Sequence, residues 1–277
     1  MYPNGLNAPP AAYLAQGIAL AQSVVPRDAG GQPNANGKTA LLSVGMSNTS
    51  MEFAVFKTTA DSDTLKNSKL VIVNGAQGAV DAEQMKSSSS SYWTTWVPQQ
   101  LSAAGVTGNQ VQTVWLKNAL ANPNYYGGFP AAAQRLQTDL QSIVQILAST
   151  FPNLQIVYLA SRIYAGYATV SLNPEPYAYE SGFSVKWLIE DRIQNSPATR
   201  PWLAWGPYLW TNGTAGRSDG LIWSCNDVNA GDGTHPSLAG EQKVAALLLS
   251  FLKTNSTAQP WFAPSFSHRT YLPLMAR

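Results

Sequence analysis

Short apolar runs alternate with longer stretches of mixed polarity along most of the chain. Almost wholly apolar runs of this length are typical of strands that are buried on both faces of a sheet. Five such runs predict strands over residues 40–44, 70–73, 111–116, 155–160 and 202–205. The stretches around them predict helices over residues 9–22, 48–59, 92–103, 131–149, 183–194 and 236–252.

The clearest helix signal lies in residues 131–149. Apolar side chains recur there at the spacing of one helical face, which predicts a helix that packs on the sheet. The residues on that face are Leu136, Leu140, Ile143, Val144 and Leu147. Gly, Pro and Asn gather in residues 25–38, which we interpret as a loop.

Strands that alternate with helices predict a doubly wound α/β fold of the flavodoxin type. In this three-layer α/β/α arrangement, helices cover both faces of a central, mostly parallel sheet of about five strands. We expect a single domain over residues 1–253, with its core at 40–253 and an N-terminal helix and loop at 1–39. Residues 254–277 show no clear period and are expected to form a surface tail.

The chain is poor in charge. It has 17 basic and 15 acidic residues, so only 12% of its residues are charged, whereas about 25% is usual for a soluble globular domain. The net charge of +2 leaves no basic field for nucleic acid, and 45% apolar residues exclude disorder by composition. The longest nearly unbroken apolar run, 244–252, is much shorter than the about 20 residues of a membrane-spanning helix.

No signal peptide is visible at the N-terminus, because no charged segment is followed there by an apolar one. If a signal was removed, the expected location is secreted or periplasmic, and the cytoplasm stays open as the alternative. The single cysteine, Cys225, excludes an internal disulfide and a Cys-based metal cluster. We interpret its thiol as a small buried core residue rather than as a nucleophile.

Residues with catalytic potential follow the first three predicted strands, at the sheet edge where ligands bind in such folds. Ser47 stands in the sequence GMSN, where a turn from strand to helix presents the hydroxyl and the helix N-terminus favours developing negative charge. Gly75 follows the second strand and Asn118 the third, and both carry N–H groups of the kind that bind an oxyanion. Taken singly, each of the three is as readily a helix cap or a turn residue.

Histidines are scarce, which narrows the choice of a general base. Of the two in the chain, His268 lies in the expected tail, and His235 lies in the block DGTHPSLAG at the start of the last helix. Asp232 stands three residues before His235, so its carboxylate can reach the imidazole from the same turn and fix the tautomer. His235 is therefore the candidate base, and the alternative for Asp232 is a helix cap.

Together these blocks resemble the SGNH or GDSL-type hydrolases, a family named for a serine, a glycine, an asparagine and a histidine in separate blocks. The matching residues are Ser47 in GMSN, Gly75 in VNGAQG, Asn118 in WLKNA, and Asp232 with His235 in DGTHPSLAG. The resemblance covers about residues 40–253, and its last block is the most specific.

Two blocks depart from the family pattern. Met46 stands at the position before the serine where the family usually has an aspartate, and the third block lacks the usual glycine and aspartate. Asn122 and Asn124 stay open as alternatives to Asn118, which is favoured because it directly follows a strand.

The resemblance implies hydrolysis of an ester through an acyl-enzyme, with no metal or organic cofactor. Ser47 would attack the carbonyl, His235 would take its proton, and Asp232 would stabilise the imidazolium. The backbone N–H groups of Ser47 and Gly75 and the side-chain amide of Asn118 would hold the oxyanion. A monomer is the working assumption.

Aromatic residues crowd residues 175–223, which contain five of the nine tryptophans of the chain. Flat aromatic faces beside amide side chains suit sugar rings, so a carbohydrate O-acetylesterase or a short-chain carboxylesterase is the favoured function. The candidate substrate contacts are Arg162, Tyr164, Tyr208, Trp210 and Trp223. The tryptophans that are as readily core residues are Trp187, Trp202 and Trp205.

Two alternatives stay open. A lipase-like esterase would use the same serine with an acyl pocket built from aromatic residues, although no basic amphipathic helix for a membrane surface is visible. A carbohydrate-binding protein without catalysis would use the aromatic residues but would not require Ser47, Asp232 and His235. The distance between Ser47 Oγ and His235 Nε2 separates the two classes, because in a hydrolase it should be within about 3.2 Å, or somewhat longer in an unliganded form.

Overall fold

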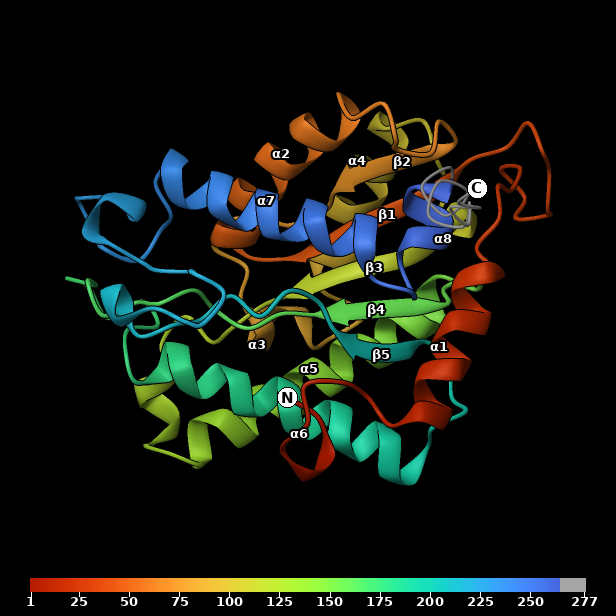
Figure 1. The fold of residues 1–277 in the computed structure, drawn as a ribbon. Helices are drawn as coiled ribbons and strands as arrows, with labels where there is room; N and C mark the ends of the chain where they lie inside the picture. The colour runs from red at the N-terminus through yellow and green to blue at the C-terminus, as the bar shows by residue number, and fades with distance from the viewer. Residues whose placement is uncertain (265–277) are drawn as a thin grey trace, which may run out of the picture.

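A computed structural model describes residues 1–264 of the chain. Its centre is a sheet of five parallel strands in the order β2-β1-β3-β4-β5 (Figure 1). The strands are β1 (Thr39–Gly45), β2 (Leu70–Asn74), β3 (Val111–Lys117), β4 (Ile156–Leu159) and β5 (Trp202–Trp205). This order confirms the doubly wound, flavodoxin-type fold, and it places the topological switch point between β1 and β3.

Helices form the two outer layers. Within residues 1–264 the α-helices are α1 (Ala11–Gln22), α2 (Ser47–Asp61), α3 (Ala82–Met85), α4 (Val97–Ala103), α5 (Ala131–Thr150), α6 (Tyr177–Asn195), α7 (Leu238–Thr254) and α8 (Gln259–Phe262). A π-helical turn at Tyr92–Trp96 leads into α4. One face of the sheet is covered by α3 to α6, and the other by α1, α2, α7 and α8.

Strand side chains alternate between these two layers, as the pleat of a strand requires. In β4, Val157 and Leu159 pack in the layer of α5, whereas Ile156 and Tyr158 pack in the layer of α7. All four side chains are buried. Burial on both sides explains why the strands appear in the sequence as unbroken apolar runs.

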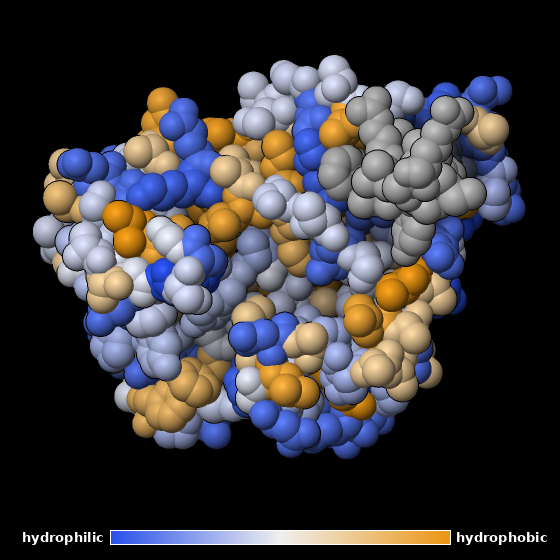
Figure 2. Space-filling view, in the orientation of Figure 1, coloured by the Kyte–Doolittle hydropathy of each residue, from blue (hydrophilic) through white to orange (hydrophobic). Residues whose placement is uncertain are grey.

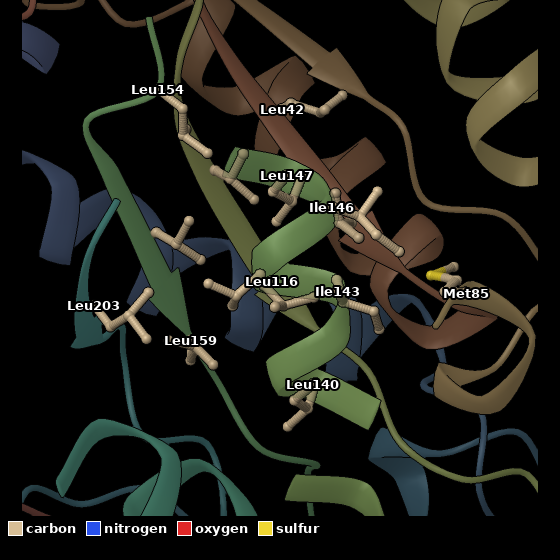
Figure 3. Packing of buried hydrophobic residues seen from close by; sticks show 14 of the residues in the cluster. Leu42, Met85, Leu116, Leu140, Ile143, Ile146, Leu147, Leu154, Leu159 and Leu203 are labelled. Atoms are coloured by element: carbon tan, nitrogen blue, oxygen red, sulfur yellow. The ribbon is translucent and has the colours of Figure 1, made fainter. Parts of the chain in front are cut away.

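The contact between α5 and the sheet is made of hydrocarbon side chains. Leu140, Ile143 and Leu147 lie close to Leu116 of β3, and Leu159 and Leu203 extend the cluster over β4 and β5 (Figure 3). The buried face of α5 is the one that the 3.6-residue spacing predicts, and that prediction is confirmed.

Three helices differ from the predicted elements. Helix α6 begins at Tyr177, six residues earlier than expected, with Pro176 at its N-cap. Its first two turns are polar and aromatic, so the apolar period emerges only later in the helix. The helices α3 and α8 were not expected, because four residues are too few for a periodic signal.

Residues 254–263 do not form the expected surface tail. Trp261 and Phe262 of α8 are 1% and 0% exposed and pack in the layer of α7. Asn67 secures the segment, because its side chain donates to the carbonyl of Trp261 at 3.1 Å and its backbone N–H to that of Phe262 at 2.7 Å. The two aromatic side chains anchor a segment whose polar sequence suggested a tail. His268 lies outside the described residues.

Two tyrosine hydroxyls cover the open edge of β5. Tyr13 donates to the carbonyl of Leu203 at 2.9 Å and accepts the N–H of the same residue at 3.2 Å. Tyr2 accepts the N–H of Trp205 at 3.1 Å. Burial raises the pKa of both tyrosines to about 12, so both stay protonated at neutral pH. The hydroxyls satisfy backbone groups that an edge strand otherwise leaves unpaired.

The surface is mixed in character. Figure 2 shows hydrophobic and hydrophilic residues interspersed over one face of the molecule. The exposed large hydrophobic side chains of the described chain are Leu6, Tyr125, Phe129, Val170, Tyr179, Ile222 and Leu238. None of the described helices is both long and apolar enough to span a membrane.

Candidate active site

The turn from β1 into α2 carries Ser47, at the sheet edge on the left of Figure 1. Gly45, the last residue of β1, pairs in register with Lys117 of β3. A side chain at position 45 would place its Cβ 2.0 Å from the Lys117 carbonyl oxygen, so only glycine allows this close approach. Met46 at the N-cap provides no side-chain cap, which leaves the N–H groups of the first turn of α2 uncapped beside Ser47.

Ser47, His235 and Asp232 come together at this edge, although 188 residues separate the serine from the histidine. Ser47 Oγ lies 2.7 Å from His235 Nε2, and His235 Nδ1 lies 2.8 Å from Asp232 Oδ2. The side chains of His235 and Asp232 are 23% and 27% exposed. The three groups therefore form a continuous hydrogen-bonded chain that a ligand can reach from solvent.

The bonds to Asp232 decide the tautomer of His235. Burial by itself would raise the pKa of Asp232, but the backbone N–H groups of Thr234 and His235, which both donate to Oδ1, and the His235 ring lower it below its ordinary value. Asp232 is then an anion at neutral pH and can only accept, so Nδ1 of His235 carries the proton. Nε2 is free to accept the hydroxyl proton of Ser47.

Thr234, the residue before His235, is held by two side chains from other elements. Arg162 Nη2 donates to Thr234 Oγ1 at 2.8 Å and to the Thr234 carbonyl at 3.4 Å. Asn48 Nδ2 donates to the same carbonyl at 2.9 Å. Because Asn48 is the neighbour of Ser47, this carbonyl links the turn of the serine to the turn of the histidine.

An ion pair is buried below the Ser47 turn, and the sequence pattern did not indicate it. Lys117 Nζ lies 2.7 and 2.6 Å from the two carboxylate oxygens of Glu52, and the side chains are 1% and 0% exposed. Burial raises the pKa of Glu52 and lowers that of Lys117 to about 8, and the contact between them opposes both shifts. The available signal was Lys117 itself, the one charged residue in the five strands of the described chain.

Two of the expected oxyanion donors have other partners. The N–H of Gly75 donates to Ser43 Oγ at 3.2 Å. Asn118 is 3% exposed, and its Nδ2 donates to Met85 Sδ at 3.0 Å. A thioether sulfur is a weak acceptor, so the NH2 group of Asn118 is engaged only weakly, whereas its Oδ1 accepts the N–H of Ala119 at 2.8 Å.

Gly78, the second glycine of the VNGAQG block, lies beside Ser47. A Cβ built at position 78 would be 3.9 Å from Ser47 Cβ. Gln77 ties this loop to the serine turn through its N–H, which donates to the carbonyl of Gly45 at 2.9 Å. The next residue, Ala79, has a φ of 64°, a left-handed conformation that is costly for a residue with a side chain and is common at functional sites.

A polar cavity of about 210 Å³ lies between the loops that follow β2 and β3. Its lining residues are Ala79, Asp81, Glu83, Gln84, Ala121, Asn122, Tyr125 and Tyr126. One lining residue, Ala79, directly follows Gly78, so the cavity lies near the turn of Ser47. Tyr125 is 79% exposed at its rim, and Asn122 and Asn124 are also exposed.

Two of the five candidate substrate contacts lie in the interior. Arg162 is 2% exposed and is bonded to Thr234. Trp223 is 0% exposed, and its Nε1 donates to the carbonyl of Leu209 at 2.8 Å. The expected contact with substrate is not met at these two positions, because both follow strands in loops that fold back over the core.

Aromatic rings border the histidine turn. Tyr164 and Trp210 are half-buried, and the Tyr164 ring contacts the rings of Trp210 and Tyr167 at centroid distances of 6.3 and 5.3 Å. Tyr167 packs against the histidine turn, because a Cβ at Gly233 would lie 1.8 Å from its carbonyl oxygen. The backbone of this segment also reaches Asp232, whose carbonyl accepts the N–H of Thr169 at 2.9 Å.

The remaining aromatic residues of the segment divide between core and surface. Trp202 and Trp205 of β5 are buried, and Trp187 on α6 is half-buried. Tyr208 is half-buried and lines a second cavity of about 190 Å³ together with Tyr179 and Phe183. Of the candidate contacts, Tyr164, Tyr208 and Trp210 thus keep exposed surface.

Cys225 is exposed, so the expectation of a core thiol is wrong. It lies on a 3₁₀ turn, Cys225–Asp227, in a loop before α7. Within residues 1–264, no three His, Cys, Asp or Glu side chains are grouped so that they could hold a metal ion.

The chain matches no protein family model and no curated protein. It is similar in fold to a gut microbial diltiazem-metabolizing enzyme (14% identity, TM-score 0.46, covering 83% of this chain and 48% of that one). It is also similar to a candidate acylhydrolase from Bacteroides fragilis (10%, 0.43, 83% and 90%) and to a salicylyl-acyltransferase from a tetracycline biosynthetic pathway (13%, 0.41, 82% and 58%). The chain thus spans about half the length of the first of these proteins.

Proposed function

We propose that this protein is a serine ester hydrolase of the SGNH type that works through an acyl-enzyme. The observation that carries the proposal is the hydrogen-bonded chain from Ser47 through His235 to Asp232, at 2.7 and 2.8 Å. It stands at the switch point of a doubly wound sheet, where ligands bind in such folds. A carbohydrate-binding protein without catalysis has no use for a serine, an imidazole and a carboxylate in this order.

The reaction proceeds in two halves. As Ser47 Oγ attacks the ester carbonyl, His235 Nε2 takes the hydroxyl proton and then delivers it to the alcohol oxygen, whose bond to the acyl carbon breaks. In the second half His235 Nε2 takes a proton from the water that attacks the acyl carbon, and it returns this proton to Ser47 Oγ as the bond between Oγ and the acyl carbon breaks and the acid leaves. Asp232 stabilises the imidazolium in both halves.

The oxyanion is held by the N–H of Ser47, at the uncapped start of α2, together with Gly75 and Asn118. When the oxyanion forms, the N–H of Gly75 donates to it instead of to the Ser43 hydroxyl, and the side-chain amide of Asn118 donates to it instead of to the Met85 thioether. An anion is a stronger acceptor than either of these groups. Asn118→Ala is expected to lower kcat by about 100- to 1000-fold, the usual cost of one oxyanion donor. If kcat is unchanged in the folded variant, Asn118 is not a donor, and the exposed Asn122 and Asn124 become the next variants to measure.

The favoured substrate is an O-acetylated carbohydrate or another short-chain carboxylic ester. The polar cavity beside Gly78 combines carboxylates, amides and the exposed ring of Tyr125, a set suited to sugar hydroxyls and to stacking. Tyr164 and Trp210 add partly exposed aromatic surface. The low charge of the chain, 12%, fits an uncharged ester better than an anionic one.

A hydrolysis panel tests the function and its substrate class. It compares an aryl acetate, an aryl octanoate and an acetylated oligosaccharide, with Ser47→Ala as the control. We expect acetate esters to be cleaved and the Ser47→Ala variant to be inactive while its circular dichroism spectrum is unchanged. Preference for the octanoate would instead support a lipase-like esterase, and full activity of Ser47→Ala would exclude the mechanism.

A further inference from the structure

Three charged side chains lie buried below the catalytic residues. Glu52 is on α2, five residues after Ser47. Lys117 ends β3, directly before Asn118, and Arg162 follows β4. They are 0%, 1% and 2% exposed. We call Glu52, Lys117 and Arg162 the buried ionic cluster.

The Glu52–Lys117 pair connects the helix of the nucleophile to the strand before Asn118. Lys117 is bound to α2 twice, through its ammonium group on Glu52 at 2.6 and 2.7 Å and through its carbonyl, which accepts Thr49 Oγ1 at 2.5 Å. Thr49 is two residues after Ser47. Any shift of the serine turn along β3 therefore has to break a buried ion pair.

Arg162 connects the same region to the histidine turn. Its Nη2 reaches both the hydroxyl and the carbonyl of Thr234, the carbonyl that also accepts Asn48 Nδ2. The planar guanidinium suits such a two-point contact. Burial lowers the pKa of Arg162, and the charges of Glu52, Glu175 and Asp232 oppose this shift.

Arg162 is costly for the folded state. Its Nε and Nη1 atoms are buried and have no hydrogen-bond partner within residues 1–264. A buried charge with unpaired N–H groups destabilises a fold, and an apolar side chain of similar size at such a position is often neutral or stabilising. Packing therefore does not account for an arginine at this position.

We propose that Arg162 is a positioning residue that fixes Thr234, and with it Asp232 and His235, on the serine turn. The Glu52–Lys117 pair holds the other side of that turn. This inference rests on the ester hydrolase function proposed above. It assigns to Arg162 a role in placing the base rather than a contact with substrate.

Arg162→Met and Thr234→Val test the contact from its two sides. The first removes the guanidinium and keeps the length of the side chain. The second keeps the shape of the side chain and removes the hydroxyl, which accepts from Arg162 and also donates to the carbonyl of Leu172 at 3.0 Å. Thr234→Ser is the conservative variant, because it retains the hydroxyl. Arg192→Met is the matched control. Like Arg162, Arg192 donates two hydrogen bonds, here to the backbone carbonyls of Thr199 and Pro201, but it lies at the far end of α6.

We expect kcat to fall about 10- to 100-fold in Arg162→Met and Thr234→Val with little change in KM, because a small displacement of a catalytic group has effects of this size. The melting temperature of Arg162→Met should stay level or rise. Thr234→Ser should recover most of the activity lost in Thr234→Val, and Arg192→Met should keep the kcat of the wild type.

A proton NMR signal gives a readout that does not depend on turnover. The Nδ1 proton between His235 and Asp232 is expected far downfield in the wild type and should shift or disappear in Arg162→Met. If the folded Arg162→Met variant keeps both this signal and its kcat, the proposal is wrong. If Arg162→Met does not fold, full activity of Thr234→Val overturns it instead. A wild type without esterase activity, or an active Ser47→Ala variant, would refute the hydrolase function, whereas the NMR comparison would still test the positioning of His235.

Discussion

Helices cover both faces of the sheet, but the contacts buried beneath α5 and beneath α2 differ in chemical character. On the face of α5, side chains such as Leu140 and Ile143 meet the sheet with hydrocarbon (Figure 3). On the face of α2, close to the carboxyl edge of the strands, Glu52 and Lys117 form an ion pair at 1% exposure or less. The first face gains stability from apolar burial. The second accepts charges whose burial is costly, and it does so directly below the candidate catalytic serine.

This difference separates two ways of fixing a structure. Apolar contacts are not directional, so side chains of similar volume can replace one another with small losses. A buried ion pair with two short contacts fixes both partners, because any displacement leaves a charge without its partner. Both faces have an apolar core, and the face of α2 adds to its core a specific buried contact below the candidate serine.

The largest predicted effect on the free energy of unfolding comes from a variant that removes only one partner of the Glu52–Lys117 ion pair. Lys117→Met leaves the carboxylate of Glu52 buried and unpaired, which is expected to cost about 3–5 kcal/mol in the free energy of unfolding. In the double variant Glu52→Met/Lys117→Met neither charge of the pair is left, so part of this loss should be recovered, whereas the buried charge of Arg162 stays and loses the attraction of Glu52. Urea denaturation of the wild type and the two variants measures both values. Equal instability of the single and double variants would show that lost packing, not the unpaired charge, is responsible.

The second prediction concerns the apolar face. Leu140 is 1% exposed, and Leu140→Ala is expected to lower the free energy of unfolding by about 2–5 kcal/mol, through lost burial and the cavity left behind. The kcat of the folded fraction should be unchanged, because the side chain packs on the face of the sheet that does not carry the ion pair. A large fall in kcat would contradict this division between the faces. Ile143→Val is the mild control, with an expected loss of about 0.5–1.5 kcal/mol.

The two faces also differed in how far the sequence predicted them. The spacing of Leu136, Leu140 and Ile143 is a local signal, so it predicted both the helix and its buried side. The strands could be predicted equally well from the sequence, because burial on both faces makes each one an apolar run. Local sequence patterns were therefore sufficient to predict the elements whose packing is made of apolar side chains.

The polar interior required information that local patterns do not hold. Glu52 and Lys117 are 65 residues apart, and each alone looks like a solvated charge. Arg162 was expected in the cleft, because residues after a strand often line it, and the sequence does not show that Thr234 lies within its reach. The donors of the oxyanion site depend on loop conformation in the same way, so Gly78 was overlooked beside Gly75.

The third prediction concerns a buried polar contact far from Ser47. Tyr13→Phe removes the hydroxyl that both donates to and accepts from the backbone of Leu203. Two buried backbone groups lose their partner, which is expected to cost about 1–3 kcal/mol in the free energy of unfolding. No change in kcat is expected, because this contact lies on the edge of β5 rather than below the serine. Thermal unfolding and steady-state kinetics of the one variant measure both quantities, and a loss of kcat would show that polar contacts matter for catalysis wherever they lie.

The smallest effect is a pH dependence at the loop before α7. Asp227 has a side chain that is 4% exposed and lies 2.6 Å from Lys243 Nζ. Burial by itself would raise its pKa, but the bonds from Lys243 and from the N–H and hydroxyl of Ser224 lower it below the ordinary value of 3.8. The unfolded chain therefore takes up a proton at a higher pH than the folded protein does.

The stabilisation by Asp227 is complete above pH 3.8 and is lost as the pH falls through this value toward the lower pKa of the folded state. Asp227→Asn cannot titrate, so its deficit relative to the wild type, on the order of 1 kcal/mol at neutral pH, should shrink between pH 5 and pH 3, roughly the range over which a free aspartate is protonated. Melting temperatures of both proteins at several pH values measure the difference. A constant difference across this range would mean that Asp227 acts through its shape and hydrogen bonds alone, and that the charges which matter on this face are those of Glu52 and Lys117.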